Sequence, residues 1–212
     1  MSGAATGSRK GWLFGTLLFA AVATSAFVWW VHGWPVLTGR VLRDHIGHNP
    51  MLSVHVVGGS FMILSGAANL FIGWTRLGFR FHKFIGYSYL LLGGIGAVSA
   101  IALSISLRHP PVSVGVATAT LGAVWLTFAA MAWRAAKNRR FETHREWVIR
   151  SYVVTWTFVG CRLAQSFPLF GYLGAEGITA GIWLYWVVPV IVCEVALQWR
   201  RGAALRSSGL AD

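Results

Sequence analysis

The chain has 212 residues, of which 56% are hydrophobic and 11% charged, and its formal net charge is +12. These values exclude an ordinary soluble globular domain, in which about 25% of residues are charged. The cations lie in the gaps between long apolar runs and do not gather on one basic face, so the net charge does not predict a nucleic-acid partner. The partner that this composition predicts is the lipid bilayer.

Six long apolar stretches follow one another along the chain, each of about 20 residues or more. A helix of that length crosses a hydrocarbon core of about 30 Å, and lipid offers backbone amides no other partners. The sequence therefore predicts an all-α integral membrane bundle of six transmembrane helices, forming one domain over residues 12–200 with tails at 1–11 and 201–212. The predicted spans are 12–31, 51–73, 84–107, 112–133, 147–170 and 178–199.

The cationic residues are unevenly divided between alternate gaps, and this division predicts the orientation of the helices. With the N-terminus inside, the inner segments hold 13 lysines and arginines and the outer segments hold 3. Because cytoplasmic loops carry the excess of positive charge in membrane proteins, both termini are predicted to be cytoplasmic. A cleaved secretory signal is the weaker interpretation of the first run, since that run continues through Trp30.

Ionisable side chains inside the spans form an inner layer of five residues. His82 begins the third span, while His144, Arg145 and Arg150 begin the fifth, and Glu194 lies near the inner end of the sixth. Neutral imidazole is a common axial ligand of b-type haem, and arginines suit its propionates, so His82, His144, Arg145 and Arg150 are the candidate haem site. Alternatively, the histidines are interfacial polar residues, and Arg150 pairs with Glu194 in a structural ion pair.

A second, outer layer contains His55, about one turn into the second span, and Arg162, near the outer end of the fifth. No neighbouring span has an acidic residue at the depth of Arg162. Guanidinium binds carboxylates and phosphates bidentately, so His55 and Arg162 are a candidate site for an anionic or lipidic ligand. The alternatives for Arg162 are pairing with Glu176, bonding to carbonyls, or snorkelling to the interface.

Other motifs predict less chemistry. Asp44, His45 and His48 offer a weak metal cluster in an outer loop, and we predict no metal site. Cys161 and Cys193 should differ in depth by more than about 10 Å, too far for a disulfide.

Glycines and alanines spaced seven apart in the third span predict close helix packing or a flat face for a planar cofactor. No nucleotide-binding loop, nucleophile elbow or zinc-protease motif is present, so an enzyme activity is neither predicted nor excluded.

Distinctive motifs lie at residues 55–60 with Gly66, at 80–87, at Trp125, and at 144–152 followed by Arg162. Together these segments resemble a family of bacterial membrane proteins, the domain-of-unknown-function 2306 family. Val148 stands where that family usually has methionine. The resemblance, which covers about residues 55–194, implies a multi-pass protein of the bacterial inner membrane and names no substrate. A looser likeness to transmembrane b-type cytochromes is an analogy.

Three classes of function follow from these features. The first is a redox module in which His82 and His144 hold haem b and exchange electrons with a quinone or another membrane redox partner. The second is a carrier or binder of a small anionic or lipidic molecule at His55 and Arg162. The third is an accessory or assembly subunit of a larger membrane complex. The central part of each span lacks aspartate and glutamate, which argues against a cation-coupled pump.

Overall fold

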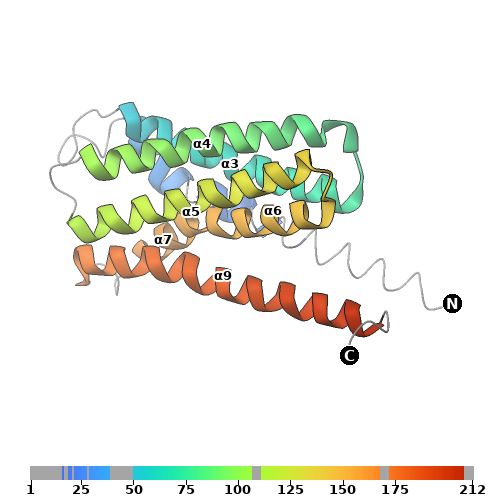
Figure 1. The fold of residues 1–212 in the computed structure, drawn as a ribbon. Coiled ribbons are helices and arrows are strands. Elements are labelled where there is room, and N and C mark those ends of the chain that lie inside the picture. Colours follow the sequence, from blue (N-terminus) through green and yellow to red (C-terminus); the bar gives the residue numbers. More distant parts are fainter. Residues whose placement is uncertain are drawn as a thin grey trace. The chain divides into compact units, whose positions relative to one another are not determined.

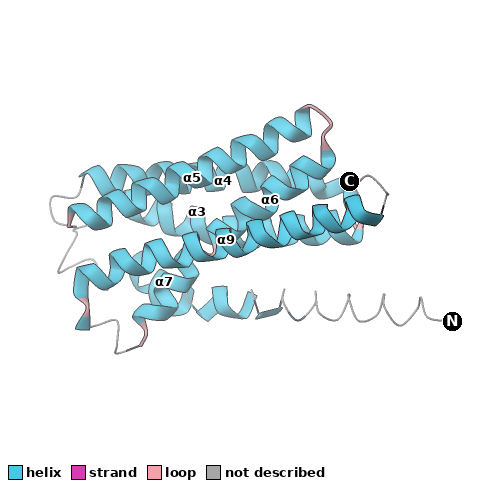
Figure 2. Ribbon diagram, turned by 60° about the horizontal axis from the view of Figure 1, so that its bottom comes forward, coloured by secondary structure: helices cyan, strands magenta, loops and turns pink. Residues whose placement is uncertain are grey.

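The computed structural model describes residues 16, 19–20, 22–27, 29–38, 50–106, 111–167 and 172–207, and these are helical with short turns (Figures 1 and 2). The described part contains no β-strand, which confirms the all-α fold class. The elements in chain order are the π-helix η1 (Trp29–Gly33), α2 (Trp34–Leu37), α3 (Pro50–Thr75), the 3-10 helix η2 (Phe79–Phe81), α4 (His82–Ser106), α5 (Val112–Lys137), α6 (Phe141–Thr155), α7 (Thr157–Gln165) and α9 (Gly174–Ser207).

Four helices of the described part are long and apolar enough to cross a membrane. They cover Met51–Thr75, Phe79–Ile105, Val112–Lys137 and Gly174–Ala203, and they correspond to the second, third, fourth and sixth predicted spans. Much of the first predicted span, 12–31, lies outside the described residues. The fifth, 147–170, is divided between α6 and α7. The count of six spans and the cytoplasmic termini therefore stay predictions.

The chain forms two compact units, Met1–Gly93 and Gly94–Asp212, and the division falls inside α4. In the first unit, α3 and the start of α4 pack through small residues. A side chain at Gly86 would meet the Asn69 amide, with Nδ2 3.2 Å from an added Cβ, and one at Gly73 would meet His82 Cε1 at 3.3 Å. These glycines let the two helices approach closely, as small residues do in lipid.

The turn between α3 and α4 depends on left-handed backbone conformations. Arg76 has φ of 63° and Gly78 has φ of 67°, and the short helix η2 follows before α4 begins at His82. The Arg76 amide donates to the carbonyl of Ile72 at 2.9 Å. Glycine adopts this conformation without strain, whereas arginine does so at a cost of about 1 kcal/mol or more.

In the second unit, α6 packs against α5, and α9 packs against α5, α6 and α7 (Figure 1). The core between them combines apolar side chains with three hydroxyl side chains, Ser151, Thr155 and Thr157, which are at most 1% exposed. Ala117, Leu121 and Val159 are at most 2% exposed, and Trp125 is 4% exposed while its indole Nε1 donates to Thr155 Oγ1 at 3.0 Å. Alanines and glycines of α5 bring its backbone close to its neighbours, and the tryptophan bond adds a polar link between α5 and α6.

The break between α6 and α7 lies beside a proline in α9. Pro189 has no amide hydrogen, so the carbonyl of Tyr185, four residues earlier, loses its helical donor. Thr157 Oγ1 donates to Val154 O at 2.7 Å and also lies 3.4 Å from this Tyr185 oxygen. Gly160 packs on the same tyrosine, because an added Cβ would lie 2.5 Å from Tyr185 Cδ1. The break between α6 and α7 therefore lies next to the backbone carbonyl that Pro189 leaves without its helical donor in α9.

Candidate functional site

A buried arginine forms the centre of a charged cluster in the second unit. Arg150, only 7% exposed, lies on α6, and its Nε and Nη2 donate to Glu194 Oε2 of α9 at 2.9 and 2.6 Å. Its Nη1 lies 3.6 Å from Glu146 Oε2, one turn earlier on α6. The Trp147 ring covers the guanidinium at 4.8 Å, a cation–π distance. The structure thus brings together the two residues that the sequence pairs, Arg150 and Glu194.

The cluster continues toward the C-terminal end of α9. Arg201 Nε donates to Glu146 Oε1 at 2.8 Å, its Nη2 also bonds Glu146, and Gln198 Nε2 donates to Glu194 Oε1 at 2.7 Å. Two arginines and two glutamates therefore neutralise one another. We name the set Glu146, Arg150, Glu194 and Arg201 the ion cluster. It links α6 to α9 and leaves little charge for a ligand.

His144 is fixed by a hydrogen bond to the neighbouring helix. Its Nδ1 lies 2.9 Å from the carbonyl oxygen of Ala132 on α5, and its side chain is half-buried. A carbonyl only accepts, so this distance assigns the proton to Nδ1 and, in the neutral ring, the lone pair to Nε2. Arg145 is also half-buried and has an interaction of its own.

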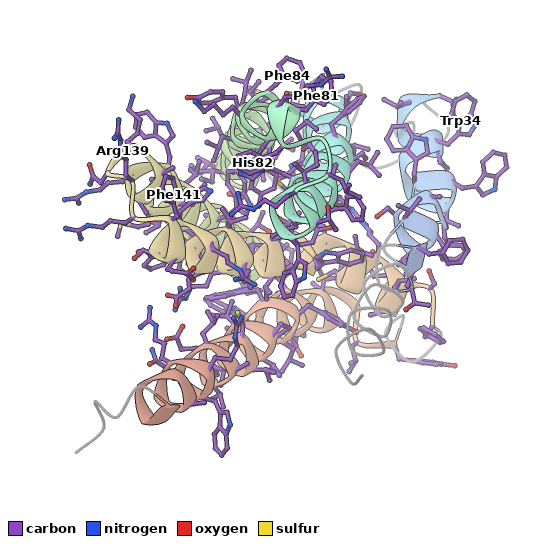
Figure 3. All side chains as sticks on the ribbon, turned by 90° about the vertical axis from the view of Figure 1, so that its right-hand side faces the viewer. Trp34, Phe81, His82, Phe84, Arg139 and Phe141 are labelled. Carbon is purple, nitrogen blue, oxygen red and sulfur yellow. The ribbon has the colours of Figure 1, made fainter. Side chains whose placement is uncertain are left out.

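His82 lies at the start of α4, in the first unit, and is held between an aromatic ring and backbone. Its imidazole stacks on Phe79 with ring centroids 5.1 Å apart and planes 10° apart, and its Cε1 faces Gly73. Figure 3 shows Phe81 and Phe84, the residues beside it, directed away from the helices. His82 and His144 belong to different units.

The outer candidates also belong to different units. His55, on α3, is half-buried and has an interaction of its own. Arg162, on α7, is exposed, and its Nη1 donates to Gln165 Oε1 at 2.8 Å. Within the described residues, no carboxylate forms an ion pair with Arg162, and this includes Glu176, the partner that the sequence offers.

The remaining sequence candidates add no site. Asp44, His45 and His48 lie outside the described residues. In the part of the chain that the structure covers, no three metal-ligating side chains cluster together. Cys161 and Cys193 are both free thiols.

Sequence reasoning missed Glu146 and Arg201 as members of the ion cluster. Glu146 precedes Arg150 by four residues, the spacing of a helical ion pair, so this contact had a signal. Arg201 had none, because it follows the last apolar run and reads as part of a solvated tail. The bond from Trp125 to Thr155 was missed for a similar reason, since no pattern in the sequence shows which faces of α5 and α6 meet.

Comparison with known proteins gives one match. The model of a family described as "Predicted membrane protein (DUF2306)" matches residues 52–197. Comparisons with curated proteins and with solved structures give no significant match. The matched residues include α4, α5, α6 and α7 entirely, together with most of α3 and of α9.

Proposed function

We propose that this chain, which belongs to the DUF2306 family of predicted membrane proteins, is a multi-pass protein of the bacterial inner membrane. From the chain's own histidines and arginines we further propose that it holds one b-type haem. Haem b supplies reversible one-electron transfer. The electron partner in this proposal is a quinone or another membrane redox protein.

The observation that supports the proposal best is the fixed imidazole of His144. Histidines that ligate metals commonly donate their second ring N–H to a backbone carbonyl, which fixes the tautomer and turns the lone pair toward the metal. The 2.9 Å contact from His144 Nδ1 to Ala132 O has this form. His144 Nε2 would then bind the haem iron. His82 is kept as a second ligand on sequence grounds alone.

The arginines divide between two roles. Arg150 donates to Glu194 through two nitrogens, so its charge is already used and it does not suit a haem propionate. We therefore keep Arg145 as the propionate partner and assign Arg150 to the link between α6 and α9. The haem site that we propose in the second unit is then His144 with Arg145.

A spectrum of histidine variants tests the haem proposal. Protein purified in detergent from cells fed a haem precursor should show a Soret band that shifts on dithionite reduction. His144→Ala should remove most of this pigment, because the imidazole that would bind the haem iron is lost. His55→Ala, a half-buried histidine outside the site, should keep it. Size-exclusion profiles that match the wild type show that both variants are folded.

Two results would contradict the haem proposal. One is a colourless wild-type protein from the haem-precursor-fed cells. The other is a His144→Ala variant that keeps its pigment and whose Soret band lies at the same wavelength as in the wild type. His82→Ala, measured beside these variants, tests the second ligand separately, since its pigment should fall or change spin state if His82 binds iron.

A second candidate function rests on Arg162. A guanidinium near the end of a predicted span, with an amide partner and without a carboxylate among the described residues, suits an anionic headgroup. In this proposal Arg162 binds the carboxylate or phosphate of a small lipidic ligand. His55 stays a candidate member of the site from sequence.

Ligand-induced stabilisation tests this second candidate. Oleate and lysophosphatidate should each raise the melting temperature of the wild type, because a ligand that binds only the folded state stabilises it. Arg162→Gln should abolish the shift, whereas Arg200→Gln, an exposed arginine of α9, should keep it. Equal shifts in both variants would overturn the assignment.

A further inference from the structure

The turn between α5 and α6 carries a surface that the proposed functions do not use. Arg134, Lys137, Arg139 and Arg140 lie within seven positions of one another, and all four side chains are exposed. We name these four residues the basic turn. Figure 3 shows Arg139 and Phe141 near one another at this turn.

The charge of the basic turn is not neutralised by the described residues. The ion pairs found there join Arg150 and Arg201 to glutamates, and none includes a member of the basic turn. Glu142, in the first turn of α6, is the nearest acidic residue in the sequence and is exposed. Four neighbouring cations without carboxylate partners repel one another, and a bound polyanion would relieve that repulsion.

Exposed aromatic residues flank the cations. Trp133 is 49% exposed on α5, and Phe141 is 68% exposed at the start of α6. The ammonium of Lys137 lies 6.0 Å from the centre of the Trp133 ring. Aromatic rings beside lysine and arginine at the end of a membrane helix are typical of the headgroup level, where the ring contacts acyl chains and the cation contacts phosphate.

The backbone holds two of the arginines at the tip. The Arg140 amide donates to Ala135 O at 2.9 Å and the Arg139 amide donates to Ala136 O at 3.0 Å, the pattern that ends a helix in a left-handed residue. That residue is Arg139, with φ of 57°. Glycine is the usual residue at this position, so an arginine there keeps a cation at some conformational cost.

We infer that the basic turn, with Trp133 and Phe141, binds the headgroup of an anionic phospholipid. The guanidiniums of Arg139 and Arg140 bind phosphate oxygens, and Arg134 and Lys137 add charge on the side of α5. Trp133 and Phe141 contact the upper acyl chains. Anionic lipids attract juxtamembrane cations in this way, and each cation strengthens the attraction.

Native mass spectrometry of the full chain tests this inference. The protein is released from detergent micelles that contain equal amounts of phosphatidylglycerol and phosphatidylcholine, and the ratio of the two lipid adducts is measured. The wild type should prefer phosphatidylglycerol. The double variant Arg139→Gln/Arg140→Gln should lower the adduct ratio by about fivefold or more, because two cations are lost at the tip.

A matched control removes the same charge elsewhere. Arg76→Gln/Arg80→Gln also removes two cations, from the turn between α3 and α4. There the guanidiniums lie over Phe79 and Phe81, at 4.7 and 4.6 Å. This control should keep the adduct ratio within about twofold of the wild type. Arg139→Lys/Arg140→Lys, which preserves the charge, should do the same.

Three results would overturn the inference. The first is a wild-type protein that shows no preference for phosphatidylglycerol. This result does not depend on whether any variant folds. The second is an unchanged ratio in Arg139→Gln/Arg140→Gln. The third is an equal fall in the variant and the Arg76→Gln/Arg80→Gln control, which would show attraction by overall charge alone.

Discussion

Two helical hairpins of this protein begin alike and are held together differently. In each, an arginine with positive φ ends the first helix (Arg76 and Arg139), and a histidine lies in the first turns of the second (His82 and His144). The hairpin from α3 to the start of α4 closes on glycines. The α5–α6 hairpin closes on polar bonds, and its second helix is tied to α9 by the ion cluster.

The difference shows two ways to hold helices together in lipid. Burying apolar surface gives little driving force there, so helices associate through close packing or through polar bonds. Packing depends on shape, and a larger side chain breaks it. Polar bonds depend on partners, and removing one partner leaves the other buried and unpaired. The two hairpins should therefore respond to different substitutions.

The largest effect should come from Arg150→Ala in the ion cluster. The change removes the cation between Glu146 and Glu194 and leaves two carboxylates near one another. We expect unfolding in mixed micelles to become easier by about 3 kcal/mol. Arg201→Ala, at the exposed rim, should cost about 0.5 kcal/mol. Similar losses in the two variants would contradict a central role for Arg150.

The first hairpin should be most sensitive to added bulk. Gly86→Leu places a side chain against the Asn69 amide, and we expect a loss of about 2 kcal/mol. Gly59→Ala is the control on the same unit, because an added Cβ there meets nothing within 4 Å. It should be neutral or slightly stabilising. A Gly86→Leu variant as stable as the wild type in denaturant titration would show that α3 and α4 do not pack closely here.

A smaller loss should follow from removing one polar bond of the second hairpin. Trp125→Phe keeps the aromatic ring but deletes the donor to Thr155 Oγ1. The expected loss is about 0.6 kcal/mol, the average for interhelical hydrogen bonds in membranes. Thr155→Val should lose a similar amount, and the double variant should lose little more than either single one. Additive losses would show that the two side chains act independently.

The smallest effect should have the opposite sign. Arg139→Gly relieves the left-handed arginine, and the net gain after the entropy of the added glycine should be about 0.5 kcal/mol. Arg76→Gly should gain a similar amount, because Arg76 has the same conformation at the other turn. Equilibrium unfolding of both variants checks this, and a clear destabilisation of either one would mean that the arginine side chain holds its turn.

Composition and hydropathy were enough to predict the helices that coincide with long apolar runs. The predicted spans 51–73, 84–107 and 112–133 lie almost entirely inside α3, α4 and α5. They did not predict the break inside the fifth predicted span, 147–170. Residues around Trp156 include neither glycine nor proline, so the sequence gives no sign that α6 ends at Thr155. The partner of that break, Pro189, lies more than thirty residues away on α9, and only the fold brings them together.

The candidate site was predictable only in part, because the sequence indicates the depth of a residue in the membrane but not which helix faces meet. Similar depth in the membrane suggested Arg150 with Glu194, and the structure places their charged atoms 2.6 Å apart. The depth of a residue in the membrane does not show on which side of its helix the residue lies. The contact from His144 to Ala132 O depends on which faces of α5 and α6 meet, and it became visible only in the structure.

The haem content of the wild-type protein, measured beside that of His144→Ala, decides whether His144 is a haem ligand. Protein from cells fed a haem precursor would be assayed as its pyridine haemochrome and compared with protein concentration. If His144 is a haem ligand, we expect about one haem b per wild-type chain and near zero in His144→Ala. A wild-type content near zero, with the protein folded and monodisperse, would contradict it.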